Sequence, residues 1–151
     1  MLRQRFTDTL KEAMKAREEL TVSTVRLIIA KLKEQDIEAR GRGKPEGIGE
    51  PEIQQMLQGM IKQRRDSIVL YEQGKRADLV AKEQGEIAVI ERFLPQQMGE
   101  AELEGAVNAL IGELGAQGMK DMGRVMAGLK ERHAGRFDAG KASQMVKRLL
   151  G

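Results

Sequence analysis

The sequence predicts an all-helical protein in which a bundle of long N-terminal helices precedes a small three-helix C-terminal domain. Three observations favour this fold class. Apolar residues recur at three- and four-residue spacing along the whole chain, and no segment alternates as a strand does. The composition is 40% hydrophobic, 3% aromatic and 32% charged, which is typical of amphipathic helices. Pro95 ends the last long helical pattern, so we place a domain boundary between residues 94 and 95.

The predicted N-terminal domain covers residues 1–94 and holds about four helices. The first two carry apolar stripes that begin at Leu2 and after Thr21, and we expect Thr21 to cap the second helix. Residues 41–49 then contain four glycines and one proline, which predicts a mobile loop. The loop lacks the spacing of a phosphate-binding loop because no Ser or Thr follows Lys44.

Two further helices follow this loop. Pro51 lies in the first turn of a long helix whose apolar stripe continues to Gly74. We expect Asp78 to cap the fourth helix, which Pro95 ends. The N-terminal domain is therefore predicted to be built on long helices.

The predicted C-terminal domain, residues 95–151, has three short helices. The last two begin near Asp121 and Asp138, which are suited to be N-caps. From Lys120 onward the sequence has eight basic and three acidic residues, a local charge of +5. Because the whole chain carries +3, the rest carries −2, and the positive field is concentrated at the C-terminal end.

Charged residues interrupt the apolar stripes of the long helices. Arg64 lies within such a stripe, and Glu83, Glu86 and Asp36 face inward in the same way. A buried guanidinium requires an opposite charge, so we expect an interhelical ion cluster of Arg64 with Glu83 or Glu86, with Asp36 as a further member. In the alternative interpretation the three carboxylates bind a divalent metal or act as an acid–base pair.

No catalytic, metal or cofactor site is recognisable in the sequence. The absence of cysteine removes disulfides, thiolate nucleophiles and Cys-based metal sites, and His133 is the one histidine. None of the serines lies in a nucleophile elbow. No apolar run approaches the roughly 20 residues of a membrane span, and no apolar signal segment opens the chain. We therefore expect a soluble, cytoplasmic protein that does not engage membranes.

The last predicted helix carries a polar row of Lys141, Gln144 and Arg148, with Lys147 beside it. A solvated helix face is the alternative interpretation. The basic loop before this helix is expected to merge with the row into one surface that suits the phosphate backbone of a nucleic acid. The scarcity of aromatic residues favours tRNA or another folded RNA over single strands. The predicted contacts are Arg124, Arg132, Arg136, Lys141, Lys147 and Arg148.

Long ordered motifs resemble a known family. They lie at residues 62–68, 71–87, 93–95 and 121–126, and across essentially the whole chain they are similar to the GatB/YqeY family, specifically its free-standing YqeY-like proteins. The resemblance implies a two-part helical fold. Its C-terminal part is similar to the tail domain of the B subunit of the tRNA-dependent amidotransferase, a carbon–nitrogen ligase with glutamine as amido donor. In that enzyme the tail is associated with gripping the tRNA.

Several charged residues match the family's motif positions, and one residue departs from them. The matching residues are Arg64, Arg65, Glu83, Glu86, Arg124, Arg136, Lys141 and Lys147. Phe137 stands where the family usually has a small residue, so its ring is expected either to pack onto the domain or to lie in the proposed surface.

The resemblance does not bring the amidotransferase active site with it. The kinase-like cradle of the B subunit and the serine amidase of its partner have no counterpart in this sequence. We therefore expect a noncatalytic, tRNA-binding accessory module. The alternatives are a protein–protein interaction adaptor and an uncharacterised amidotransferase. A protein of the translation or tRNA-amidation machinery is a further expected partner.

Overall fold

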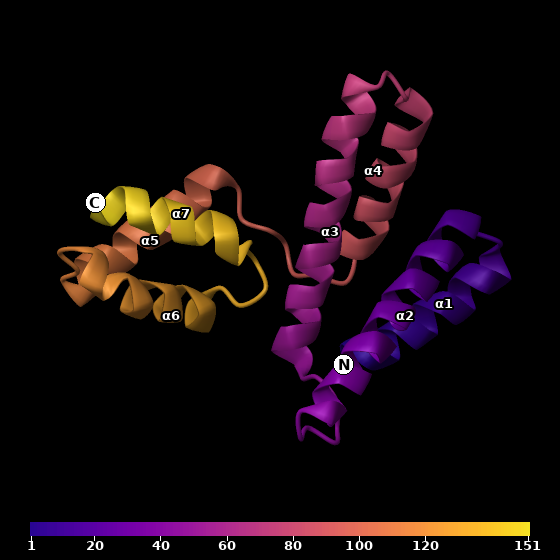
Figure 1. Cartoon of the computed structure of the whole chain (residues 1–151), viewed down its shortest axis with the longest axis horizontal. Coiled ribbons are helices and arrows are strands. Elements are labelled where there is room, and N and C mark those ends of the chain that lie inside the picture. The colour runs from indigo at the N-terminus through magenta and orange to yellow at the C-terminus, as the bar shows by residue number, and fades with distance from the viewer. The chain divides into compact units, whose positions relative to one another are not determined.

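The computed structural model describes residues 1–151 and confirms that the protein is all-helical. It contains seven α-helices, one 3₁₀ turn and no strand (Figure 1). Contacts divide the chain into two compact units, Met1–Leu94 and Pro95–Gly151. Each unit has a hydrophobic core of its own. None of the helices combines the length and the apolar character that a membrane-spanning segment needs.

The N-terminal unit is built from two pairs of adjacent helices. Its elements are α1 (Leu2–Ala16), α2 (Glu19–Gly41), α3 (Glu50–Gln73) and α4 (Ala77–Glu91). α1 packs on α2, and α3 and α4 form an antiparallel hairpin (Figure 1). α4 also packs against α2, so the two pairs share one core.

Two predicted helix caps in this unit are wrong. α2 begins at Glu19, two residues before Thr21. Thr21 therefore lies within the first turn, where its side chain is buried. Asp78 lies inside the first turn of α4. Its carboxylate accepts hydrogen bonds from the Arg76 guanidinium, at 3.1 and 3.2 Å.

The core of the N-terminal unit is aliphatic, with one aromatic pair. Ile28, Leu57 and Ile90, from α2, α3 and α4, are completely or almost completely buried. Full burial of such a side chain stabilises the fold by roughly 1.5–3 kcal/mol. The rings of Phe6 and Phe93 meet edge to face at 4.9 Å between centroids, which fixes α1 against the segment that follows α4.

The α3–α4 hairpin extends beyond this core. The buried residues of α3 end at Ile61, and those of α4 begin at Glu86. Farther along the hairpin Val69 and Leu70 are 53% and 67% exposed. The far half of the hairpin is therefore held by contacts between its own two helices.

The connection between α2 and α3 is tied to the rest of the unit by Asp36. The two terminal nitrogens of Arg3 donate to its carboxylate at 2.7 and 2.8 Å, and one of them also donates to the Ile48 carbonyl at 2.8 Å. Asp36 also accepts the Ile48 N–H at 2.9 Å. These bonds join α1, α2 and the connection near Ile48. The mobility expected of residues 41–49 stays a prediction.

The C-terminal unit has a second, separate core. Its elements are α5 (Glu100–Leu114), the 3₁₀ turn η1 (Met119–Asp121), α6 (Met122–Arg132) and α7 (Ala139–Leu150). Val107 of α5, Val125 of α6 and Val146 of α7 are fully buried at its centre. Leu110 of α5 approaches Gly128 of α6 so closely that a Cβ there would lie 2.8 Å from its Cδ2.

The structure resolves two further expectations in this unit. Phe137 is 8% exposed and belongs to the core, so its ring packs onto the domain. Asp138 is the N-cap of α7 and accepts the Lys141 N–H at 3.1 Å, as predicted. Asp121 precedes α6 without a capping bond, because its carboxylate accepts hydrogen bonds from the Gln117 N–H and from Arg124.

Replacement of Gly47 by Ala is expected to destabilise the protein strongly. Gly47 has φ +82°, and an added Cβ would lie 2.2 Å from Oδ1 of Asp36, so it would break the contacts of this carboxylate. Gly43 is the matched control because it has φ +89° but open space around it. Gly43→Ala should cost about 1–2 kcal/mol of the free energy of unfolding from backbone strain alone. Urea denaturation should show a clearly larger loss for Gly47→Ala; equal losses would contradict the role of Asp36.

The stability contributed by Asp36 should disappear in acid. The hydrogen bonds from Arg3 hold the pKa of Asp36 at about 2, below its ordinary value of 3.8. A lowered carboxylate pKa stabilises the folded state above the unfolded-state pKa, so about 2 kcal/mol should be lost as the pH falls from about 4 to about 2. Denaturation of Asp36→Asn at several pH values should show a deficit near neutrality that shrinks in this window. Asp66→Asn, at an exposed carboxylate, is the control.

Candidate nucleic-acid interface

The structure brings Arg64 and Glu86 together between α3 and α4. Arg64 Nε lies 2.7 Å from Glu86 Oε2, and Glu83 is farther away at 4.0 Å. Another nitrogen of Arg64 donates to the Met60 carbonyl at 3.1 Å. The side chains of Arg64 and Glu86 are only 12% and 9% exposed. The ion pair therefore lies at the edge of the hydrophobic core, where the α3–α4 hairpin begins to extend beyond it.

Asp36 does not join this ion cluster. Its carboxylate is bound by Arg3 and Ile48, because the chain returns past it in the connection between α2 and α3. The three carboxylates that the alternative interpretation assigned to a metal are therefore not gathered. No group of three or more His, Cys, Asp or Glu side chains in the structure is arranged to hold a metal ion.

Two of the six predicted nucleic-acid contacts, Arg124 and Arg136, form hydrogen bonds within the C-terminal unit. Arg124 donates to Asp121 and to the Leu114 carbonyl, both at 3.0 Å. The Gln117 N–H and Arg124 together lower the pKa of Asp121. Arg136 donates to the Gln96 carbonyl at 2.8 Å and to Glu102 at 3.0 Å. These guanidinium groups already have both backbone and carboxylate partners.

Two other predicted contacts, Arg132 and Arg148, each face a single carboxylate of α5. Arg132 donates to Glu113, and this hydrogen bond lowers the pKa of Glu113 and raises that of Arg132. Arg148 lies 3.7 Å from Glu104, too far for a hydrogen bond. Glu104 and Glu113 are nine positions apart on α5, about two and a half turns, and so lie on opposite sides of it. Arg132 and Arg148 therefore belong to different flanks of the unit.

The two lysines of α7 complete the predicted set. Lys141 and Lys147 are exposed, and neither forms an ion pair. Gln144 is exposed between them, while Ala142, Met145 and Val146 face the core. The row predicted from the sequence is thus the outer face of α7, which we call the α7 face and define as Lys141, Gln144, Lys147 and Arg148.

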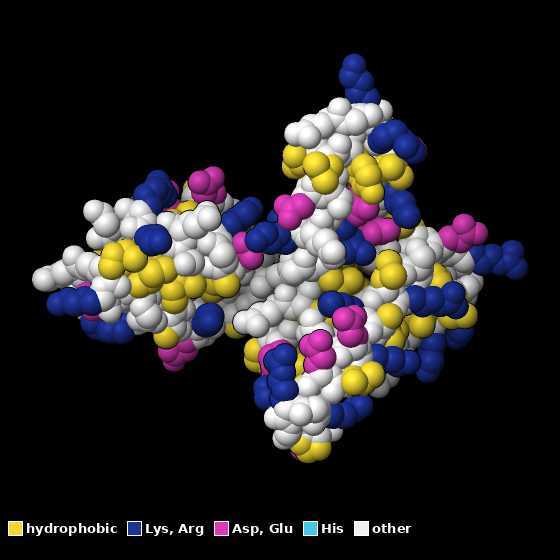
Figure 2. Space-filling model, in the orientation of Figure 1, with side chains coloured by type: hydrophobic (Ala, Val, Ile, Leu, Met, Phe, Trp, Pro, Cys, Tyr) yellow, Lys and Arg dark blue, Asp and Glu magenta, His cyan; other side chains and the backbone are white.

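The glutamates of α5 were missed by the sequence analysis. Counting charge from Lys120 onward left out Glu100, Glu102, Glu104 and Glu113. The whole unit from Pro95 has eight basic and seven acidic residues, a net charge of +1. On the face of this unit visible in Figure 2, Lys and Arg side chains are scattered among other surface. The sequence does hold a signal for them, because Glu100, Glu102 and Glu104 lie close together at the start of α5, the helix that opens this unit.

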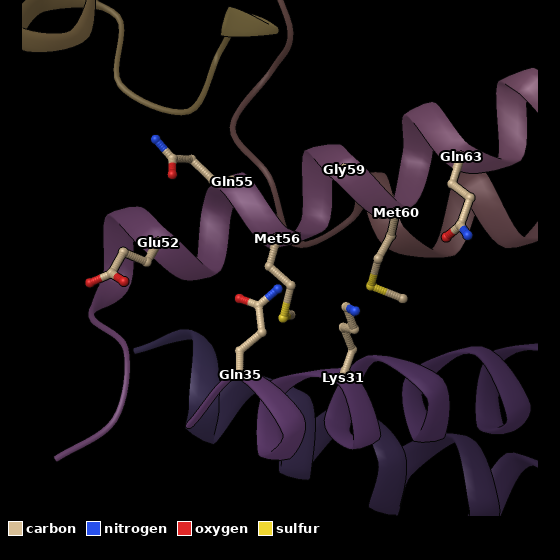
Figure 3. Close-up of a pocket in the computed structure, with 8 residues that line it drawn as sticks. All are labelled: Lys31, Gln35, Glu52, Gln55, Met56, Gly59, Met60 and Gln63. Carbon is tan, nitrogen blue, oxygen red and sulfur yellow. The ribbon is translucent and has the colours of Figure 1, made fainter. Parts of the chain in front are cut away.

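A groove of about 420 Å³ lies between α2 and α3 in the N-terminal unit. Figure 3 shows Lys31 and Gln35 rising from α2 towards Met56 and Met60 of α3. Glu52 is its one carboxylate, and it pairs with Lys44 at 3.3 Å. The groove is therefore lined by amides and thioethers, together with the ammonium of Lys31 and the carboxylate of Glu52.

Comparison with known proteins shows the family. A family model described as Yqey-like protein matches residues 3–150, so this chain belongs to the YqeY-like family. Similar curated proteins are named "Altered inheritance of mitochondria protein 41, mitochondrial". The one from Lachancea thermotolerans is 34% identical over 70% of this chain and 55% of its own length. The one from Saccharomyces cerevisiae is 35% identical over 63% of this chain and 49% of its own length. The chain thus spans about half the length of these relatives.

These names contradict the expectation of a cytoplasmic protein, because the relatives are called mitochondrial. That expectation rested on the absence of an apolar signal segment. An apolar segment is not the mark of a mitochondrial protein, since mitochondrial targeting segments are amphipathic and rich in arginine.

Removal of Arg64 should destabilise the N-terminal unit far more than removal of its neighbour Arg65. Arg64→Ala leaves Glu86 buried without a counter-charge, which typically costs about 3–5 kcal/mol of the free energy of unfolding. Arg65 is 53% exposed and pairs with Glu91 at 3.5 Å, so Arg65→Ala should cost about 1 kcal/mol or less. Urea denaturation followed by circular dichroism compares the two variants. Similar losses would show that burial of the Arg64–Glu86 pair does not matter.

Proposed function

We propose that this YqeY-like protein is a noncatalytic accessory module that binds tRNA or another folded RNA through the α7 face. One observation carries the proposal. Lys141 and Lys147 are exposed and free of ion pairs in a unit whose arginines all face carboxylates. Lysine ammonium groups without intramolecular partners are the groups most available to RNA phosphates. Residues 95–151 are the binding domain in this proposal, and residues 1–94 are its helical scaffold.

The chemistry of the C-terminal unit favours a folded RNA over a single strand. Proteins that bind single strands stack bases on exposed aromatic rings. Phe137 is the one aromatic residue of this unit, and it is buried in the core. The α7 face offers ammonium, guanidinium and amide donors, which suit the phosphates and 2′-hydroxyl groups of a helical RNA surface.

The family supports tRNA as the particular RNA. Membership of the YqeY-like family is shown, and the C-terminal motifs resemble the tail domain of the tRNA-dependent amidotransferase B subunit. In the proposal this relationship concerns RNA binding, and the amidotransferase reaction is left to other proteins. A partner from the translation or tRNA-amidation machinery is compatible with an accessory role.

A protein-binding adaptor is the second candidate function, favoured by the groove between α2 and α3. Met56 and Met60 are flexible side chains that adapt to varied partners, and the amides of Gln35, Gln55 and Gln63 line the same groove. A partner retained by the purified chain after nuclease treatment would favour this candidate.

Charge reversal on the α7 face should abolish most RNA binding. The double variant Lys141→Glu/Lys147→Glu replaces the two ammonium groups of the α7 face by carboxylates that repel phosphates. Fluorescence anisotropy with unfractionated tRNA at low salt should show a loss of affinity of about tenfold or more, and a shallower dependence on salt. Circular dichroism should show that the variant remains folded, because both side chains are exposed.

The matched control is Lys62→Glu/Lys82→Glu in the N-terminal unit. These two lysines are also exposed and without ion pairs, and the control changes the net charge by the same amount. It should bind tRNA nearly as the wild type does. Equal losses in both variants would indicate a general charge effect, and absence of tRNA binding by the wild type at low salt would refute the proposal.

A further inference from the structure

Glu104 is the acidic residue that adjoins the α7 face. Its carboxylate lies 3.7 Å from the Arg148 guanidinium, and the two side chains are 41% and 60% exposed. At this separation the two groups attract one another without sharing a hydrogen bond. Arg148 thus differs from Arg124 and Arg136, whose guanidinium groups donate to backbone carbonyls as well as carboxylates. It is held in place by one loose, exposed contact.

A phosphate that reaches Arg148 must approach the charge of Glu104. Glu104 lies 3.7 Å from Arg148, far less than the screening length of about 8 Å at physiological ionic strength. The carboxylate therefore repels a phosphate that binds Arg148. It also competes for the guanidinium. Both effects act only on a ligand that reaches this end of the α7 face, and neither acts at Lys141, at the opposite end of α7.

We propose that Glu104 weakens the contact of the α7 face with any phosphate that reaches Arg148, so that binding relies on Lys141 and Lys147 being engaged as well. A ligand that makes only the contact with Arg148 gains little, because the contact replaces an existing ion pair. A folded RNA whose phosphates reach all three cations at once retains a net gain. The inference rests on the proposed function and adds to it a residue that weakens binding.

The chain offers a closely matched control for this residue. Glu100 lies four residues before Glu104, on the same flank of α5, and is exposed. It forms no ion pair. Glu100→Gln and Glu104→Gln therefore make the same change in charge one helical turn apart, and only the second releases an arginine.

Binding of unfractionated tRNA, measured by fluorescence anisotropy over a range of salt, tests the inference with these two variants. Glu104→Gln should tighten binding by about twofold to fivefold, the range expected for loss of one exposed charge interaction. It should also steepen the salt dependence by up to about one released counterion. Glu100→Gln should tighten binding less and leave the slope unchanged. Equal effects of the two variants would overturn the inference.

A double-mutant cycle with Arg148→Gln separates a local effect from the general field. If Glu104 acts through Arg148, then Glu104→Gln should give no more gain in affinity than Glu100→Gln does when Arg148 is already replaced. A gain from Glu104→Gln that stays larger than that of Glu100→Gln in the Arg148→Gln background would overturn the inference. Thermal unfolding of each variant checks that the exposed substitutions leave the fold intact.

Heparin distinguishes failure of this inference from failure of the proposed function. If the wild type binds no RNA, the proposed function fails, and elution from a heparin column still measures the response to a repeating polyanion. Later elution of Glu104→Gln than of Glu100→Gln, with the difference lost in the Arg148→Gln background, would support the role of Glu104. Elution of Glu104→Gln and Glu100→Gln at the same salt concentration would overturn it.

Discussion

The pairing of guanidinium groups with carboxylates is the constraint on which both units of the protein depend. The cores are aliphatic, with few aromatic rings, so apolar packing alone leaves the sliding of one helix along another weakly specified. Arg64 and Glu86 set the register of α3 against α4, and Arg3 and Asp36 fix α1 against α2 and the connection that follows it. A buried ion pair adds little net stability, but an unpaired partner is costly, so incorrect registers are disfavoured.

The same constraint decides which charges remain for a ligand. Six basic residues of the C-terminal unit look equivalent in the sequence, but a guanidinium already bound to a carbonyl and a carboxylate has few donors left. Arg124 and Arg136 are structural for this reason, whereas Lys141 and Lys147 are exposed and form no ion pair. The number of basic residues therefore overstates the charge that is available to a ligand. The reason lies in α5, whose glutamates pair with arginines of α6, of α7 and of the loop between them.

The fold class and the inward position of Arg64 could be predicted from the sequence, because both follow from helical periodicity within single elements. The N-cap role of Asp138 could be predicted for the same reason, since its partner, the N–H of Lys141, is three residues away. Asp36 could not be placed. Its partner Arg3 is 33 residues distant, and the contact exists only because α1 and α2 pack side by side while the chain returns through Ile48. The pair of Arg132 and Glu113 could not be predicted for the same physical reason, since it joins two separate helices.

The size of the α7 face limits the RNA binding that we propose for it. α7 has 12 residues and is about 18 Å long, and its face offers three cations. Three phosphate contacts correspond to a salt slope of only about −2 to −3, so the electrostatic part of the affinity is modest. Such a surface discriminates poorly if every cation is freely available. A carboxylate beside Arg148 makes a contact limited to this cation less favourable while leaving the complete set attractive. In our proposal one acidic neighbour therefore makes binding depend on the two lysines, without any contact to a base.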